Sequence, residues 1–300
     1  MVDFIHNNKD RYGVDAICRI LPIAASTYYR TLDLADNPEH RAKRDLHDEH
    51  HAEQIQRIWK ESSGRYGVRK VWQQLKREGY VIARCTVARL MQKLGIQGVW
   101  RGKNKQTTRN RDDQKRADDL VKRNFNADHP NQLWVADFTY IQTNSGWVYT
   151  AFIIDVFSRA IVGWKVSTRM NTDMVLDALE QALHDRGMPK NVIHHSDRGV
   201  QYLSIRYTNR LEAANLRASV GTTGDSYDNA LAETVNGLYK TEVIEYLKAD
   251  WQGLADVQLA TLNWVDWFNK KRVHSALGYV SPFEFEAMYY DKINPLGQVA

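Results

Sequence analysis

The spacing of apolar residues predicts helices in the front of the chain and strands in its middle. Within residues 46–98, two stretches place apolar residues at i, i+3, i+4 and i+7, which predicts two amphipathic helices joined by a turn at Gly79. These positions are Val68, Val71, Trp72 and Leu75 in the first stretch, and Val87, Leu90, Met91 and Leu94 in the second. Two short helices joined in this way indicate a helix-turn-helix. A three-helix bundle that only mediates protein contacts is the alternative.

A small helical segment is predicted before this region, over residues 1–45. Its stretch from Ala25 to Arg30 fits a helix that faces DNA, and it fits a plain packing helix equally well. The segment itself offers nothing that separates the two.

The pattern changes near Pro130 to apolar runs of strand type. Three such runs, separated by turn-forming residues, predict an antiparallel meander: NQLWVADFTYI, WVYTAFIIDVFS and AIVGWKVS. A helix, a short strand, a helix, another short strand and a last helix follow. This order predicts an α/β protein whose ribonuclease-H-like mixed five-stranded sheet is flanked by helices, preceded by an all-α helix-turn-helix region.

We expect five segments from these patterns. They are an N-terminal helical segment (1–45), a helix-turn-helix DNA-binding domain (46–98), a basic linker (99–126), a ribonuclease-H-like catalytic core (127–245) and a C-terminal helical element (246–300).

Charge is divided unevenly between the two halves. Residues 1–126 carry 26 Lys and Arg against 16 Asp and Glu, a net +10, whereas residues 127–300 carry 15 against 20, a net −5. A basic front suggests a polyanion-binding arm, although a basic surface that only keeps the protein soluble is the alternative. The candidate DNA-contacting side chains are Arg84, Arg89 and Lys93 on the second helix, and Arg101, Lys103 and Lys105 in the linker.

Composition narrows the setting of the protein. A chain of 300 residues with 43% hydrophobic content can bury a sizeable core. The chain has no run of 18 apolar residues and no leader-like start, so we expect no membrane span. The isolated Cys18 and Cys85 fit a reducing cytosol, and a cytoplasmic, nucleoid-associated protein is the expectation.

Three carboxylates carry the candidate chemistry. Asp137 lies within the first strand-like run, and Asp197 follows the strand-like run at Val192–His195. Glu233 lies in a predicted helix, with 35 residues between it and Asp197. A charge inside a strand is costly unless it is paired or binds a metal. Magnesium prefers oxygen ligands, and two such ions can serve an in-line phosphoryl displacement. The three residues therefore predict a magnesium-dependent phosphoryl-transfer site.

Other candidates have less specific interpretations. Lys240 falls on the same helical face as Glu233, where it contacts DNA phosphate or remains a solvated lysine. Asp155 is expected to cap a turn. His194 and His195 are expected to be core histidines or hydrogen-bond donors behind the site rather than metal ligands.

Together these motifs resemble the integrase-type DDE transposases, and more narrowly the second-frame product (OrfB) of the IS-three family of bacterial insertion sequences. The matching pieces span about residues 47–286 and are RYGVRKVWQQLKREGY, NQLWVADFTYI, HHSDRGVQY, SYDNALAETVNGLYKTE and NKKRVHSALGYVSPFEFE. The resemblance implies that Asp137, Asp197 and Glu233 are the catalytic, metal-binding triad. It also implies that Lys240 is the basic residue two turns after the glutamate, and that residues 269–286 are a C-terminal element for DNA or subunit contacts.

The resemblance further implies cleavage at insertion-sequence ends and strand transfer by the 3′-hydroxyl. Two Mg²⁺ ions would be the cofactors, with Mn²⁺ able to substitute and no zinc. The partners would be double-stranded DNA (the terminal inverted repeats and target DNA), further copies of the chain on DNA, and an OrfA partner or fusion. Two alternatives stay open. They are a ribonuclease-H-like nuclease without strand transfer, and a catalytically silent DNA-binding repressor derived from a transposase.

Overall fold

A computed structural model describes residues 1–100, 121, 125–197, 199–220, 230–247 and 250–294. The candidate linker contacts Arg101, Lys103 and Lys105 lie outside these residues. Along the described chain the elements are α1 (Val2–Tyr12), α2 (Val14–Ile20), α3 (Ala25–Asp36), η1 (Pro38–His40), α4 (Lys43–Glu61), α5 (Val68–Arg77), α6 (Arg84–Lys93), β1 (Leu133–Thr143), β2 (Gly146–Asp155), β3 (Ile161–Ser167), α7 (Thr172–Asp185), β4 (Ile193–Ser196), α8 (Ile205–Ala213), β5 (Arg217–Val220), α9 (Ala230–Tyr239), η2 (Lys240–Glu245), α10 (Leu254–Lys270), η3 (Ser275–Leu277) and α11 (Pro282–Ile293).

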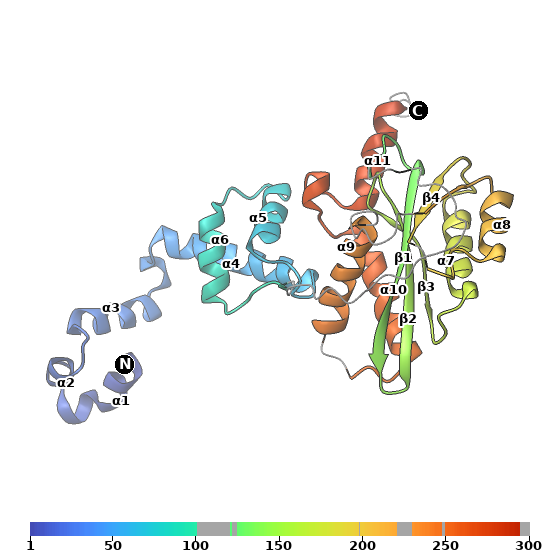
Figure 1. The fold of residues 1–300 in the computed structure, drawn as a ribbon. Coiled ribbons are helices and arrows are strands. Elements are labelled where there is room, and N and C mark those ends of the chain that lie inside the picture. Colours follow the sequence, from blue (N-terminus) through green and yellow to red (C-terminus); the bar gives the residue numbers. More distant parts are fainter. Residues whose placement is uncertain (101–120, 122–124, 198, 221–229, 248–249, 295–300) are drawn as a thin grey trace.

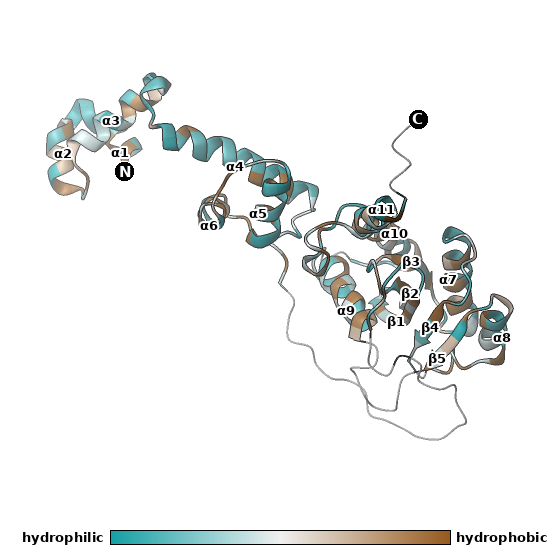
Figure 2. Cartoon of the chain, turned by 90° about the horizontal axis from the view of Figure 1, so that it is seen from above, coloured by the Kyte–Doolittle hydropathy of each residue, from teal (hydrophilic) through white to brown (hydrophobic). Residues whose placement is uncertain are grey.

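The described elements form three bodies in chain order. Helices α1–α3 stand at one end, α4–α6 lie in the middle, and the sheet with its helices forms the largest body (Figure 1; Figure 2 shows the same order from above). The first body has a small core around Ile5, Ile17 and Tyr28. The second body buries Ile55, Val71, Val87 and other apolar residues of the predicted amphipathic faces, which confirms the helical periodicity of this region.

Five strands in the described part of the chain form one mixed sheet with the order β3-β2-β1-β4-β5. Strands β1, β2 and β3 pair antiparallel, as the predicted meander requires, and β4 joins β1 in parallel. Strand β5 extends the sheet parallel to β4. The short β4 pairs with only the first part of β1, from Leu133 to Ala136.

Alternation along β1 supplies apolar side chains to both faces of the sheet. Val135 and Ile141 belong to a core shared with α9 and α10, whereas Trp134 and Ala136 belong to a core shared with α7 and α8. Helices therefore cover both faces (Figure 1). The predicted fold class, a ribonuclease-H-like sheet flanked by helices and preceded by a helical region, is confirmed by this topology.

Two features depart from a simple helical interpretation of the C-terminal third. Helix α9 ends at Tyr239, and the chain continues from Lys240 to Glu245 as the wider π-helical segment η2. Helix α10 packs Trp264 and Phe268 into the same core as the sheet, so this helix belongs physically to the sheet body.

Candidate active site

The pairing of β1 with β4 brings two of the predicted carboxylates together. Ala136 of β1 is in register with Ser196 of β4, and each is followed directly by an aspartate, Asp137 and Asp197. Because the two strands are parallel neighbours, the residues just beyond this last pair lie side by side. Both carboxyl groups therefore lie at the end of β4, on the unpaired edge of β1.

Asp137 is half-buried and held from two sides. The backbone N–H of Phe138 donates to its Oδ1 at 2.8 Å, and the side-chain amide of Asn236 donates to its Oδ2 at 2.8 Å. Burial raises the pKa of Asp137 well above its usual range, and the negative charges of Asp197 and Glu233 raise it further. The ionised form of Asp137 is therefore unfavourable unless a cation compensates its negative charge.

Asp197 lies at the surface in a tight turn. The backbone N–H of Gly199 donates to its Oδ1 at 3.0 Å, and a Cβ on Gly199 would lie 3.1 Å from the same oxygen. The glycine therefore lets the backbone approach the carboxylate closely. Tyr202 is buried near the acidic pair, and the pKa of Asp197 is raised by desolvation.

Glu233 approaches the pair from the helix that packs along β1. It stands one helical turn before Asn236 on α9, and residues three apart share a helix face. Since Asn236 bonds to Asp137, that face looks towards the acidic pair. The charges of Asp197 and Glu233 thus both act on Asp137, although no group of three His, Cys, Asp or Glu side chains in the described part of the chain is placed to hold a metal ion.

Asn236 is a site residue that the sequence patterns did not single out. It is buried, its amide nitrogen is used on Asp137, and its Oδ1 has no hydrogen-bond partner among the described residues. A buried oxygen without a donor is uncommon and needs an explanation. Two aspartates beside an unpaired amide oxygen are the kind of oxygen ligands that magnesium prefers, so the residues present fit magnesium. The sequence signal that could have identified Asn236 is its position three residues after Glu233, on the same face of the predicted helix.

The candidate DNA-contacting residues lie in different surroundings. Arg84 and Lys93 are exposed on α6, whereas Arg89 of the same helix forms an ion pair with Asp48 of α4 at 2.7 Å. Lys240 begins η2, and its Nζ lies 4.7 Å from the centre of the Tyr140 ring. Of these cations, Arg89 is the one already engaged by a carboxylate.

The residues given less specific interpretations have structural partners. Asp155 accepts hydrogen bonds from the backbone N–H groups of Ser158 and Asn131, so it caps turns as predicted. His194 is buried against the Tyr207 hydroxyl, and burial lowers its pKa to about 3. His195 is also buried, with its Nδ1 2.9 Å from the Ser219 hydroxyl.

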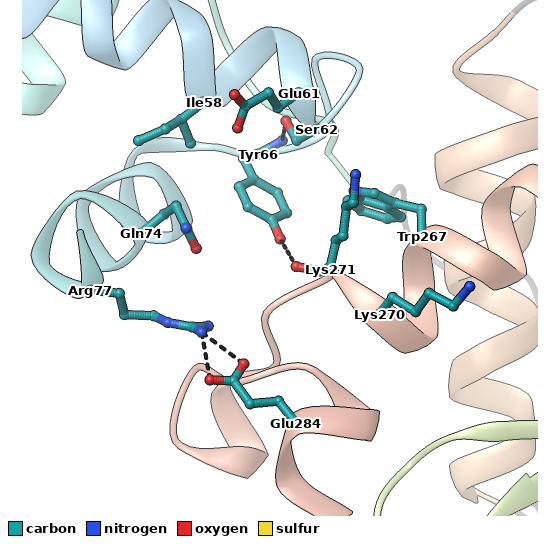
Figure 3. Close-up of a pocket in the computed structure, with 10 residues that line it drawn as sticks. All are labelled: Ile58, Glu61, Ser62, Tyr66, Gln74, Arg77, Trp267, Lys270, Lys271 and Glu284. Carbon is teal, nitrogen blue, oxygen red and sulfur yellow. Dashed lines mark hydrogen bonds and ion pairs between the residues drawn. The ribbon is translucent and has the colours of Figure 1, made fainter. Parts of the chain in front are cut away.

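The α4–α6 body is attached to the chain just after α10. The Tyr66 hydroxyl accepts from the backbone N–H of Val273 at 2.8 Å and donates to the Lys271 carbonyl at 3.2 Å, while Arg77 holds both carboxylate oxygens of Glu284 at 2.7 Å. Figure 3 shows the Tyr66–Lys271 and Arg77–Glu284 contacts at a cavity of about 230 Å³. We call this set of contacts the interdomain clamp.

A buried ion pair lies beside the interdomain clamp. Glu242 of η2 accepts from Arg272 and from the Trp264 indole, and its backbone carbonyl accepts from Arg65 of the α4–α6 body at 3.0 Å. Although desolvation opposes it, the Arg272 charge holds the pKa of Glu242 below its usual range. The π-helical segment that follows Glu233 is therefore tied both to α10 and to the helix-turn-helix body.

Comparison with known proteins agrees with this arrangement. Residues 127–226 and 214–282 match models of the integrase core domain, and residues 46–104 match an HTH-like domain. The transposase for insertion sequence element IS629 of Shigella sonnei is 52% identical over 293 residues, covering 98% of both chains. Transposase InsF for insertion sequence IS3A of Escherichia coli K12 is 32% identical over 289 residues, covering 94% of this chain and 97% of the relative.

Among solved structures, the HTLV-2 integrase catalytic core domain in complex with magnesium aligns at 19% identity with a TM-score of 0.44, covering 54% of this chain and 99% of that one. The chain's fold and its sequence relatives define it as a transposase with an integrase core domain. It belongs to the IS3 family of insertion-sequence transposases, whose function is DNA transposition. No helix in the described ranges is long and apolar enough to cross a membrane.

Proposed function

We propose that this chain is a DDE-type polynucleotidyl transferase that cleaves DNA at insertion-sequence ends and joins the freed 3′-hydroxyl to target DNA. Asp137, Asp197 and Glu233 are its catalytic triad. The observation that carries the proposal is the end of the β1–β4 pairing. Asp137 and Asp197 lie side by side just beyond it, and the Glu233 helix bonds to Asp137 through Asn236.

The proposal gives each residue a role in handling charge. Asp137 and Asp197 would hold one Mg²⁺ and Glu233 would help to hold a second, with Mn²⁺ able to replace either. Bound there, the metal would supply activation of the attacking oxygen and stabilisation of the leaving one in an in-line displacement. The chain itself orients Asp137 through Asn236 and Phe138, and it anchors Asp197 through the Gly199 amide.

DNA recognition is assigned to the basic regions outside the triad. The helix-turn-helix at residues 46–98 presents Arg84 and Lys93, and the linker at 99–126 adds Arg101, Lys103 and Lys105 as phosphate contacts. The bound DNA is the terminal inverted repeat and the target duplex. Several copies of the chain, with an OrfA partner or fusion, would assemble on it.

The experiment that tests the triad compares wild type with Glu233→Gln on DNA carrying the element's terminal repeat. We expect wild type to cut and join in the presence of Mg²⁺, and the variant to bind the same DNA while losing roughly 10³-fold or more in rate, since metal and electrostatic stabilisation supply most of such catalysis. Glu212→Gln, the same chemical change at an exposed position on α8, is the matched control and should keep full activity.

The outcomes separate the rival functions. Cleavage without joining by wild type would favour a nuclease. DNA binding without reaction by wild type, both alone and with the OrfA partner, would favour a silent repressor. Full activity of Glu233→Gln would overturn the triad itself.

A further inference from the structure

Two large aromatic side chains are exposed together on the β1–β2 hairpin. Tyr140 and Trp147 are each 48% exposed, and their ring centres lie 5.4 Å apart in an edge-to-face arrangement. Trp147 is in register with Gln142, two residues beyond Tyr140, so the two rings are diagonal neighbours on one face of the hairpin. Single exposed aromatics are ordinary, whereas an adjacent pair offers a continuous apolar surface.

A lysine completes this surface. The Nζ of Lys240 lies 4.7 Å from the centre of the Tyr140 ring, a cation–π distance. Among the described residues, no carboxylate forms an ion pair with the Lys240 ammonium group, whose contact is with the Tyr140 ring. We call Tyr140, Trp147 and Lys240 the aromatic shelf. It combines stacking faces with a cation that remains available to a phosphate.

The aromatic shelf borders the acidic site. Asn236 of α9 bonds to Asp137 of β1. Lys240, four residues after Asn236, contacts Tyr140, three residues after Asp137. Strand β1 and the α9–η2 segment therefore contribute residues to both the acidic site and the aromatic shelf. Strand β4 pairs with β1 only up to Ala136, which leaves the β1 edge beyond it without a β4 partner in the described part of the chain. Tyr140 therefore lies roughly 10 Å from Asp137 along this open edge. Because residues three apart point to opposite faces of a strand, the Tyr140 ring leaves β1 on the other face from the Asp137 carboxyl group.

We propose that the aromatic shelf stacks an unpaired base of the DNA strand that enters the acidic site, while Lys240 contacts the adjoining phosphate. This proposal deepens the proposed function and rests on it. Aromatic side chains stack on the π-face of any base. Inside a duplex both faces are covered by the neighbouring bases, and a paired terminal base offers only its outer face, so a base that has left the stack offers the most accessible face. The shelf thus favours DNA whose end is frayed or forked over a fully paired end.

The test measures DNA binding without catalysis. Full-length protein is titrated, in the presence of a chelator, with a terminal-repeat duplex that ends either fully paired or in a short unpaired fork. We expect Tyr140→Leu and Trp147→Leu to weaken binding to the forked DNA by roughly 5- to 100-fold, the range for losing one base–aromatic stack. Binding to the paired duplex should change less than about twofold, because it depends on phosphate contacts elsewhere.

A second readout reports stacking directly. With 2-aminopurine in the fork, wild type should quench the fluorescence of this base, and the leucine variants should restore it. Tyr140→Phe and Trp147→Phe keep an aromatic face and should bind and quench as wild type does. Tyr290→Leu, on α11 and 44% exposed, is the control for loss of an exposed tyrosine away from the site.

Two results would overturn the aromatic shelf. One is unchanged affinity and quenching in both leucine variants, and the other is an equal loss on forked and paired DNA, which would indicate a general phosphate surface. Because no metal is present, these results do not depend on the cleavage assay. An active triad with a neutral shelf would remove this inference alone.

Discussion

At the scale of single residues, the acidic site depends on one amide. The Nδ2 of Asn236 donates to Asp137, and its buried Oδ1 accepts no hydrogen bond from any described residue. This arrangement fixes the orientation of one carboxylate and adds an acceptor beside two negative charges. It stabilises the folded protein poorly without a cation, since an unsatisfied buried polar atom and neighbouring carboxylates both cost free energy. Such local cost is typical of a binding site.

We therefore predict that Asn236→Ala lowers the single-turnover rate of terminal-repeat cleavage by roughly 10- to 100-fold, the loss of about one hydrogen bond to a charged group. Its midpoint of thermal unfolding should change little, because the orphaned Oδ1 is removed together with the donor. Asn263→Ala, at an exposed position on α10, is the matched control. Wild-type cleavage by Asn236→Ala would show that Asp137 needs no such support.

At the scale of elements, one glycine sets how closely a helix covers the sheet. A Cβ on Gly163 of β3 would lie 2.2 Å from the Ala178 carbonyl oxygen and 2.9 Å from the Ala182 Cβ, both on α7. The helix therefore packs directly on the strand backbone. The acidic pair stands near the centre of the same sheet, so its position relies on this packing.

Gly163→Ala should lower the free energy of unfolding by about 1–3 kcal/mol, the usual cost of overpacking, because a helix carbonyl cannot move aside as a side-chain end can. Urea denaturation measures this change. Lys165→Ala, which removes an exposed ion pair to Asp177 of the same helix, should cost less than about 1 kcal/mol. An unchanged urea midpoint for Gly163→Ala would mean that α7 can shift without penalty.

The elements were largely predictable because their apolar periodicity is local. The predicted runs match β1, β2 and β3 to within three residues, and the placement of Asp137 on the first strand followed from them. The π-helical start at Lys240 and the role of Asn236 were not predictable in this way. Asn236 bonds to Asp137, about 100 residues earlier in the chain, and the π-helical segment carries Glu242, which forms a buried ion pair with Arg272. Contacts of this kind leave no periodic signal in the sequence.

At the scale of the whole molecule, the α4–α6 body and the sheet body are joined by contacts between distant parts of the chain. Tyr66 lies 205 residues before Lys271, the carbonyl to which its hydroxyl donates. Arg65, which directly precedes Tyr66 in the sequence, donates to the Glu242 carbonyl. The segment that carries Glu233 into η2 is thus connected through Glu242 to the helix-turn-helix body. These contacts join the α4–α6 body to the segment that follows Glu233.

Within the interdomain clamp, the two sets of contacts differ in their surroundings and so in their expected contributions. The Tyr66 hydroxyl is buried, and replacing it by Tyr66→Phe leaves the Val273 N–H and the Lys271 carbonyl without their partner, at about 1–3 kcal/mol. The Arg77–Glu284 pair is largely solvated, so Arg77→Ala should cost less than about 1 kcal/mol of attachment. A solvated pair can orient the two bodies, but it cannot hold them together alone.

Hydrogen exchange at the Val273 amide checks this ranking. We expect exchange to be roughly 5- to 100-fold faster in Tyr66→Phe and to change by less than about fivefold in Arg77→Ala, following the two free energies. The cleavage rate on terminal-repeat DNA should fall with the same ranking if attachment of the α4–α6 body is what places DNA at the acidic site. Faster exchange with an unchanged cleavage rate would instead show that the two bodies meet on the DNA itself, and that the clamp organises only the free protein.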